Sequence, residues 1–252
     1  SVARFRVFLG ALLLGVAAIG TVGSVAEAMR DGIAGNARLL LGGDVELRSL
    51  YMPTPDDLID TAAQYGTLSR TMTMRAMLQV DGERRLVALK AVDATWPMVG
   101  SAALAGGGDL APAIAPGKIV IDPKLARGLD LAPGSMVRIG DVDLEVSDTL
   151  AYEPDRSVSF VTFGPRVLMS LASLEATGLM QPGAMITYRT RLLLPDNADR
   201  GAAIASIKTA AANGPVRVRD LMDAAPGFDV FIDRTEACLG LVGLTALSSG
   251  GL

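Results

Sequence analysis

The feature that most constrains this chain is a run of 20 residues without a charge, from Val7 to Ala26. At a rise of ~1.5 Å per residue, a helix of this length spans roughly 30 Å, the thickness of the hydrocarbon core of a bilayer. Arg4 and Arg6 precede the run, and the positive-inside rule places them in the cytoplasm. We therefore predict that residues 1–26 form a first transmembrane helix, with Arg4 and Arg6 setting its topology.

Two other interpretations of this run stay open. Arg4 and Arg6 also suit the n-region of a signal peptide, and Ser24-Val25-Ala26 has the small-x-small form of a cleavage site. A signal peptide, however, usually has a hydrophobic region of only ~7–15 residues. A buried core helix is the remaining alternative. The membrane anchor is favoured because a second apolar run follows far along the chain.

That second run extends from Ala237 to Leu252, where the chain stops. Its 16 residues are slightly short for a complete span, so we interpret 229–252 as the approach to a truncated second transmembrane helix. The first residue is Ser, which also suggests a piece of a longer protein. Small residues permit close helix–helix packing in membranes, and the candidate packing residues are Ala11, Gly15, Gly20, Ser24, Gly240 and Gly243.

Composition excludes several classes of function. The chain has no His and one Cys, Cys238, so it has neither a disulfide framework nor the usual kind of zinc site. A nucleophile paired with His is excluded for the same reason. The net charge of −4 argues against nucleic-acid binding. The sequence also contains no phosphate-binding P-loop motif and no nucleophile elbow. We therefore predict no catalytic, cofactor or metal residues in this chain.

Between the apolar runs, residues 27–236 carry all 27 acidic residues and every basic residue except Arg4 and Arg6. Residues 27–43 are predicted to continue the first helix as a stalk that stops at Gly42-Gly43. Gly32 and Gly35 weaken such a helix by roughly 1 kcal/mol each relative to Ala. We expect this stalk to be compliant there.

Residues 44–228 show a mixture of helix and strand patterns. The predicted strands are 44–51, 71–80, 84–92, 118–121, 135–139, 142–152, 157–163, 184–195 and 216–220. Asp81-Gly82 is a hairpin turn signal, and Thr54 is the expected N-cap of a helix that runs to about Tyr65. Further helices are expected at 170–178 and 197–212. Without a strict βαβ rhythm, the pattern indicates an α+β domain. Two mixed subdomains are expected, with a loop or crossing near 96–117.

The order of these features resembles a known family of membrane proteins. The stretches LLGGDVELR (40–48), PKLARGLDLAPGSMVRIG (123–140), PRVLMSLASLEATGL (165–179) and PGAMITYR (182–189) carry the resemblance. They are similar to the permease subunits of MacB, LolC and FtsX-type ABC transporters with a MacB-like periplasmic core domain, and especially to YbbP-type permeases. These motifs are patterns of packing and turns rather than catalytic signatures.

The resemblance implies a non-catalytic permease subunit in the bacterial inner membrane, with residues 27–236 in the periplasm. It implies a separate cytoplasmic ATPase and a second permease subunit or homodimer copy as partners. A lipid-like or hydrophobic cargo and a periplasmic partner are further expectations from it. A membrane-anchored periplasmic binding or scaffold module without transport is the main alternative. A periplasmic hydrolase is disfavoured by the absence of His and by the single Cys.

Overall fold

A computed structural model describes residues 37–155 and 164–224. The chain divides into two units, and residues 38–220 form one of them. Of the other unit, only residue 37 and the short helix α7 (Leu221–Ala224) are described. Both predicted transmembrane runs and most of the stalk lie outside the described residues. Within the described part, no helix has the length and apolarity needed to cross a membrane.

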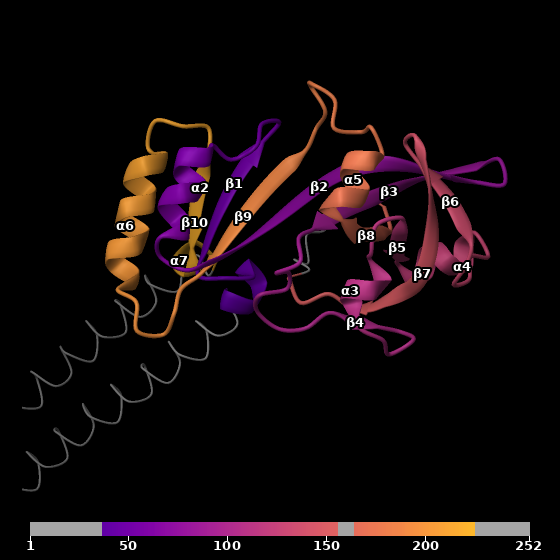
Figure 1. Ribbon diagram of the computed structural model, residues 1–252, viewed down its shortest axis with the longest axis horizontal. Coiled ribbons are helices and arrows are strands. Elements are labelled where there is room, and N and C mark those ends of the chain that lie inside the picture. Colours follow the sequence, from indigo (N-terminus) through magenta and orange to yellow (C-terminus); the bar gives the residue numbers. More distant parts are fainter. Residues whose placement is uncertain (1–36, 156–163, 225–252) are drawn as a thin grey trace, which may run out of the picture. The chain divides into compact units, whose positions relative to one another are not determined.

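The unit 38–220 contains ten strands and five helices among its described residues (Figure 1). The strands are β1 (Val45–Leu50), β2 (Thr67–Val80), β3 (Glu83–Val92), β4 (Ala103–Leu104), β5 (Lys118–Ile121), β6 (Met136–Ile139), β7 (Val142–Tyr152), β8 (Arg166–Ser170), β9 (Thr187–Leu193) and β10 (Arg217–Asp220). The helices are α2 (Asp56–Ala63), α3 (Leu110–Ala113), α4 (Pro123–Gly128), α5 (Leu171–Ala176) and α6 (Arg200–Ala211). This content agrees with the mixed class predicted from the sequence.

The described strands join in one mixed sheet. Their order is β10-β1-β9-β2-β3-β8-β5-β7-β4, and β6 pairs with both β2 and β7. The β3–β8 and β5–β7 pairs are parallel, and the other pairs are antiparallel. The long strand β2 pairs with β9 along its first half and with β3 and β6 further on. The predicted division into two subdomains, with a crossing near 96–117, stays a prediction.

The hairpin of β2 and β3 forms as the sequence predicted. Asp81 and Gly82 both have positive φ, at 47° and 81°. This is the backbone of a two-residue hairpin turn whose twist matches that of the flanking strands. Val80 therefore pairs with Glu83, and the register continues to Thr71 opposite Val92.

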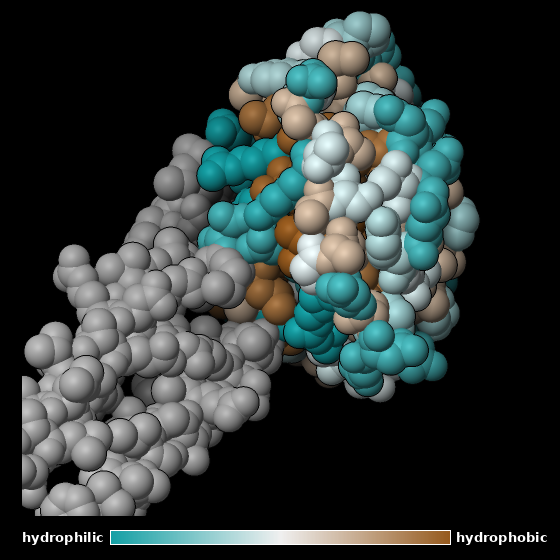
Figure 2. Space-filling model, turned by 90° about the vertical axis from the view of Figure 1, so that its left-hand side faces the viewer, coloured by the Kyte–Doolittle hydropathy of each residue, from teal (hydrophilic) through white to brown (hydrophobic). Residues whose placement is uncertain are grey.

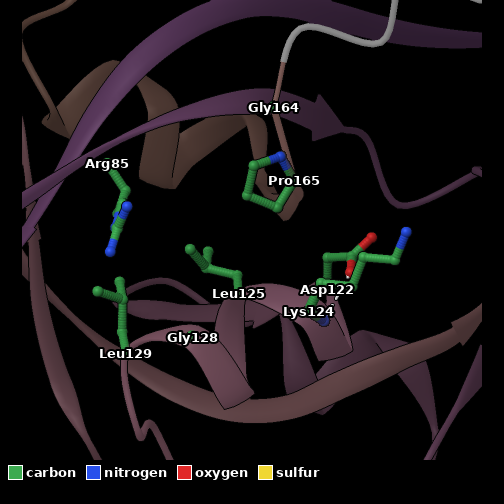
Figure 3. Close-up of a pocket in the computed structure, with 8 residues that line it drawn as sticks. All are labelled: Arg85, Asp122, Lys124, Leu125, Gly128, Leu129, Gly164 and Pro165. Carbon is green, nitrogen blue, oxygen red and sulfur yellow. Dashed lines mark hydrogen bonds between the residues drawn. The ribbon is translucent and has the colours of Figure 1, made fainter.

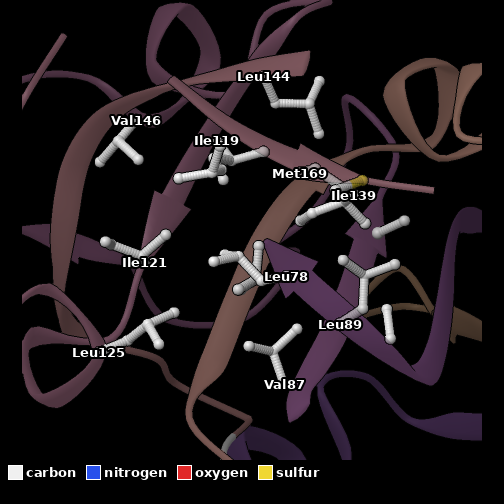
Figure 4. Close-up of a cluster of buried hydrophobic side chains, with 14 of the residues drawn as sticks. Leu78, Val87, Leu89, Ile119, Ile121, Leu125, Ile139, Leu144, Val146 and Met169 are labelled. Carbon is white, nitrogen blue, oxygen red and sulfur yellow. The ribbon is translucent and has the colours of Figure 1, made fainter. Parts of the chain in front are cut away.

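Three clusters of buried apolar side chains form the core. The largest contains side chains of β2, β3, β5, β6, β7 and β8, together with side chains of α4 and α5 (Figure 4). The second lies under α2 and α6, which pack side by side over β1, β9 and β10 (Figure 1). Because side chains alternate across a strand, Leu68 faces the second cluster while Ser69 and Thr71 face the opposite side of β2.

The third cluster corrects one expectation from the sequence. Of the two interpretations of the stretch 96–117, the surface loop is wrong, because the stretch contains β4 and α3. Its side chains Trp96, Leu104 and Ile114 are buried in the third cluster against β5, β7 and β8. A run rich in Gly and Pro thus still contributes core residues, because its apolar side chains are spaced between the turns.

A second correction concerns the start of α2. Thr54 was predicted as its N-cap, but the capping position is held by Pro55 and no side chain caps the helix. Thr54 is buried and its hydroxyl has no hydrogen-bond partner among the described residues. The acidic residues Asp56 and Asp57 lie in the first turn, at the positive end of the helix dipole. The predicted strand 157–163 lies outside the described residues.

Candidate functional site: a buried ion-pair network

The chain enters and leaves the unit 38–220 at neighbouring strands. β1 is the first strand and β10 the last, and they pair with Val45 opposite Asp220. Because the pair is antiparallel, the start of β1 and the end of β10 lie at the same end of the ladder. The segments that precede β1 and follow β10 are therefore both attached at this end.

The connection into β1 is held by a charged clamp. Residues 37–41 are helical, and Gly42 has a φ of 75°, as expected where a helix stops at a glycine. The Arg38 guanidinium donates to both carboxylate oxygens of Asp44, at 2.9 and 2.8 Å. Asp44 also accepts from the backbone N–H of Leu194 at 2.8 Å. The hydrogen bond to Asp44 is the main cause that raises the pKa of Arg38 above its usual range, against the effect of burial.

A buried lysine lies at the centre of the network. Lys90 on β3 donates from Nζ to Glu153 at 2.8 Å and to Asp155 at 2.6 Å. Its ammonium also lies 4.2 Å from the centre of the Trp96 ring, a cation–π contact. The side chains of Lys90, Glu153 and Asp155 are 4%, 0% and 2% exposed. A buried charge requires compensation of this kind, and here two carboxylates and one ring surround one cation.

The two carboxylates extend the network in different directions. Glu153 accepts from Arg166 Nε on β8 at 3.1 Å. Asp155 pairs with Arg191 Nη2 on β9 at 2.8 Å. Asp155 thus joins β3 to β9, and Glu153 joins β3 to β8.

Glu46 on β1 closes the network toward the end where the chain enters. Its carboxylate lies 3.5 Å from Arg189, 3.7 Å from Arg191 and 3.5 Å from Arg219 on β10. Ion pairs therefore run without a break from β10 and β1 through β9 to β3 and β8. On β1, β9 and β10, the charged side chains of the network lie on the sheet face opposite the second core cluster, because Glu46 and Arg191 alternate with Val45, Leu47 and Leu192.

The electrostatics of the network shift three pKa values. Burial raises the pKa of Asp155, but Lys90, Arg191 and the hydrogen bonds from Lys90 and Trp96 outweigh it and bring the pKa to about 2. Burial lowers the pKa of Lys90, and the carboxylates of Asp155 and Glu153 oppose this shift. Burial also lowers the pKa of Arg189 to about 10. Asp155 is therefore ionised throughout the neutral and mildly acidic range.

Two surface pockets are lined by residues outside the network. One, of about 490 Å³, is lined by Arg85, Asp122, Lys124, Leu125, Gly128, Leu129, Gly164 and Pro165 (Figure 3). Arg85 and Lys124 lie at opposite sides of this pocket, with Leu125 between them (Figure 3). The other, of about 320 Å³, lies around the β2–β3 turn and β6. Among residues 37–155 and 164–224, no cluster of Asp, Glu, Cys or His could hold a metal ion.

The candidate residues chosen from the sequence lie elsewhere. Arg4, Arg6, Ala11, Gly15, Gly20, Ser24, Gly32, Gly35, Gly240 and Gly243 all fall outside the described residues. Sequence reasoning missed the network, although one signal for it was present. Arg189 and Arg191 alternate with Tyr188, Thr190 and Leu192 in the mostly buried strand β9, and Lys90 interrupts an apolar run in β3. Charges in such strands need buried counter-charges, but the partners Glu153 and Asp155 cannot be identified from spacing.

The side of the unit at α2, α6 and β10 is mostly hydrophilic. Figure 2 shows hydrophilic residues over much of this side, with hydrophobic residues exposed in smaller areas between them. The large apolar side chains that are exposed include Leu50, Tyr51 and Met52 at the end of β1, and Met185 before β9.

Comparisons with known proteins agree with this architecture. The family model of the MacB-like periplasmic core domain matches residues 7–210. The chain is 30% identical over 180 residues to the uncharacterized ABC transporter permease YbbP of Escherichia coli K12, a match that covers 71% of this chain and 22% of that protein. The chain thus spans about a fifth of the length of this relative.

A solved structure has a similar fold. The periplasmic region of MacB from Actinobacillus actinomycetemcomitans matches with a TM-score of 0.51 at 11% identity, covering 81% of this chain and 98% of that one. The resemblance predicted from the sequence motifs is therefore confirmed. The chain belongs to the family of MacB-like periplasmic core domains.

Proposed function

We propose that the chain is part of a permease subunit of an ABC transporter in the bacterial inner membrane. In this proposal the residues between the apolar runs form a periplasmic domain, and Arg4 and Arg6 lie on the cytoplasmic side. The domain couples ATP hydrolysis by a separate cytoplasmic ATPase to the export or extraction of a hydrophobic, lipid-like cargo. A second permease subunit or a second copy of the chain completes the transporter. Membership of the family and the permease relative support this proposal.

The observation that carries the proposal is the pairing of the first strand with the last. A domain inserted between two consecutive membrane spans must receive and return the chain on one side, and the Val45–Asp220 pairing provides this arrangement. The apolar runs 7–26 and 237–252 flank this unit in the sequence. A domain attached in this way responds to relative movement of its two connections.

The Arg38–Asp44 clamp and the ion-pair network support a mechanical role. Arg38 lies within the predicted stalk 27–43, and its carboxylate partner Asp44 directly precedes β1. From Glu46 onward, ion pairs tie β1 to β9 and β10, and through Asp155 to β3. In the proposed mechanism, movement of the stalk reaches β1 through the clamp and then the sheet as a whole.

The test uses the full-length permease with its ATPase partner in proteoliposomes. We expect Asp44→Asn to reduce ATP-dependent extraction of a fluorescent phospholipid while ATP hydrolysis continues, because the clamp loses its charge. Gly35→Pro should have the same effect, since Pro removes a backbone donor and kinks the predicted stalk helix. Asp60→Asn, at an exposed position on α2, is the matched control and should leave both rates unchanged. Full extraction by both altered proteins would favour the passive scaffold module instead.

A further inference from the structure

A row of three arginines crosses β10, β1 and β9. Arg217 on β10 pairs with Arg48 on β1, and Arg48 pairs with Arg189 on β9. Cross-strand partners have Cβ atoms about 4.5–5.5 Å apart and project from the same face of the sheet. Like charges placed directly opposite one another in this way are destabilising. The sequence therefore keeps three cations in one row although their mutual repulsion destabilises the sheet.

The acidic residues of this face do not balance the row. Glu46 lies two residues before Arg48 on the same face of β1, and it pairs with Arg189, Arg191 and Arg219. Asp155 is shared between Arg191 and Lys90. Among the described residues, the side chains of Arg48 and Arg217 have no hydrogen-bond or ion-pair partner, although both backbones pair within the sheet. This excess of positive charge occurs in a chain whose net charge is −4.

The row is accessible to solvent on the sheet face that α2 and α6 leave free. Both helices cover the opposite face, where Val45, Leu47 and Leu192 are buried. Arg217 is exposed, and Arg48 and Arg189 are half-buried. Partial burial strengthens an interaction with a bound anion, because the local dielectric constant is lower than in water. Burial is the main cause that lowers the pKa of Arg189; Glu46 opposes this shift, and the charges of Arg191 and Arg48 add to it.

We propose that Arg48, Arg189 and Arg217 form a binding site for a phosphate group, either free or as a phosphate ester. Arginine side chains match the oxygens of phosphate bidentately, and three guanidinium groups from adjacent strands surround one such group. Thr73, which accepts from Arg189 Nη1 at 2.9 Å, fixes the orientation of that guanidinium. Leu50 lies two residues beyond Arg48 on the same face and is 51% exposed, so an ester with an apolar group also fits.

This site is independent of the proposed transport function, since it requires only the described residues. It predicts an unusual separation of stability from binding. Removing a charge from the row relieves repulsion, so the variant is at least as stable as the original chain without an anion. The same change removes part of the anion site, so stabilisation by phosphate is lost.

The test measures thermal unfolding of the full chain in an uncharged detergent, with inorganic phosphate against chloride at matched ionic strength. A parallel series adds short-chain phosphatidylglycerol or, as its control, short-chain phosphatidylcholine to the micelles. We expect phosphate, phosphatidylglycerol or both to raise the Tm, and the pattern identifies whether the source is free phosphate or an anionic lipid. The Arg48→Gln/Arg217→Gln protein should show an apparent Kd raised by at least about tenfold, with an unchanged or higher Tm in chloride.

Arg84→Gln, at an exposed position on β3, is the matched control for loss of positive charge. It should bind phosphate or phosphatidylglycerol like the original chain. Two results would overturn the proposal. One is that neither anion raises the Tm of the original chain. The other is that the double variant keeps the full increase, which would place the site elsewhere.

Discussion

Asp155 holds two buried cations at the centre of the network. It accepts from Lys90 at 2.6 Å and pairs with Arg191 at 2.8 Å. Removal of its charge leaves both cations in a low-dielectric environment with fewer counter-charges. Removing one partner of a buried pair is far more harmful than removing an exposed one. The contribution of Asp155 therefore exceeds that of any pair on the surface.

We expect Asp155→Asn to lower the free energy of unfolding by about 3–5 kcal/mol. Asp143→Asn is the control, because Asp143 forms an exposed pair with Arg138 at 3.5 Å, and its loss should change stability by about 0–1 kcal/mol. Fluorescence of Trp96, the only Trp in the chain, reports directly on the network because its ring contacts Lys90. Equal stability of the two variants would contradict this role for Asp155.

The same two variants should also differ in how their Tm depends on pH in acid. Asp155 has a pKa of about 2 in the folded chain against an ordinary value of 3.8. A lowered carboxylate pKa stabilises the fold above the unfolded value, and this stabilisation is lost as pH falls from about 4 through about 2. The difference corresponds to on the order of 2 kcal/mol. The Tm of Asp155→Asn should therefore fall less steeply over this interval than the Tm of Asp143→Asn.

At the scale of elements, two turns that contain a glycine with positive φ differ in the space available for a side chain. Gly82, in the β2–β3 turn, has a φ of 81° and open space around the position of a Cβ. Gly140, between β6 and β7, has a φ of 59°, and a Cβ there would collide with the carbonyl oxygen of Thr177 at the end of α5. The N–H of Asp141 donates to the same oxygen at 2.9 Å, which holds this turn against the helix.

Replacement of each glycine by alanine tests this difference. Gly82→Ala should cost about 1–2 kcal/mol, the penalty of a left-handed backbone for a residue with a Cβ. Gly140→Ala should cost more, because the collision with Thr177 adds to the same penalty and separates the turn from α5. Urea unfolding of both variants measures the two values. A smaller loss for Gly140→Ala would mean that the contact with α5 is easily displaced.

Elements with a local signal were predictable from the sequence, and long-range pairings were not. Asp81-Gly82 and the flanking alternation predict the β2–β3 hairpin because the turn itself fixes the register. Nothing local indicates that β3 pairs in parallel with β8, since the two strands are far apart in the sequence. The candidate site depends on such pairings: Lys90 meets Glu153 and Asp155 only after β3, β7 and β8 have assembled. Thr54 failed as a predicted cap because α2 begins at Asp56, which puts Pro55 rather than Thr54 at the capping position.

For the whole molecule, the described unit 38–220 has a complete sheet and buried clusters of its own. We expect a fragment of these residues to fold without detergent. Its stability should not change with reductants or chelators, because the fragment contains neither Cys nor His. A fragment that starts at Asp44 should be less stable, since it lacks Arg38 as partner of a carboxylate that is only 2% exposed. Circular dichroism and urea unfolding compare the two. Equal stability would show that Arg200, 3.8 Å from Asp44, replaces the clamp.

The pairing of β1 with β9 and β10 also sets the order of events during synthesis. β1 leaves the ribosome first among these strands, yet its neighbours in the sheet are the last two to be made. Pairings between residues so distant in sequence form slowly, because a long loop must close before any contact is gained. Glu46 and Leu47 therefore remain unpaired with β9 and β10 until nearly the whole unit has been translated. An interruption of translation before residue 187 would leave β1 with an open edge, available to the same strand of another nascent chain.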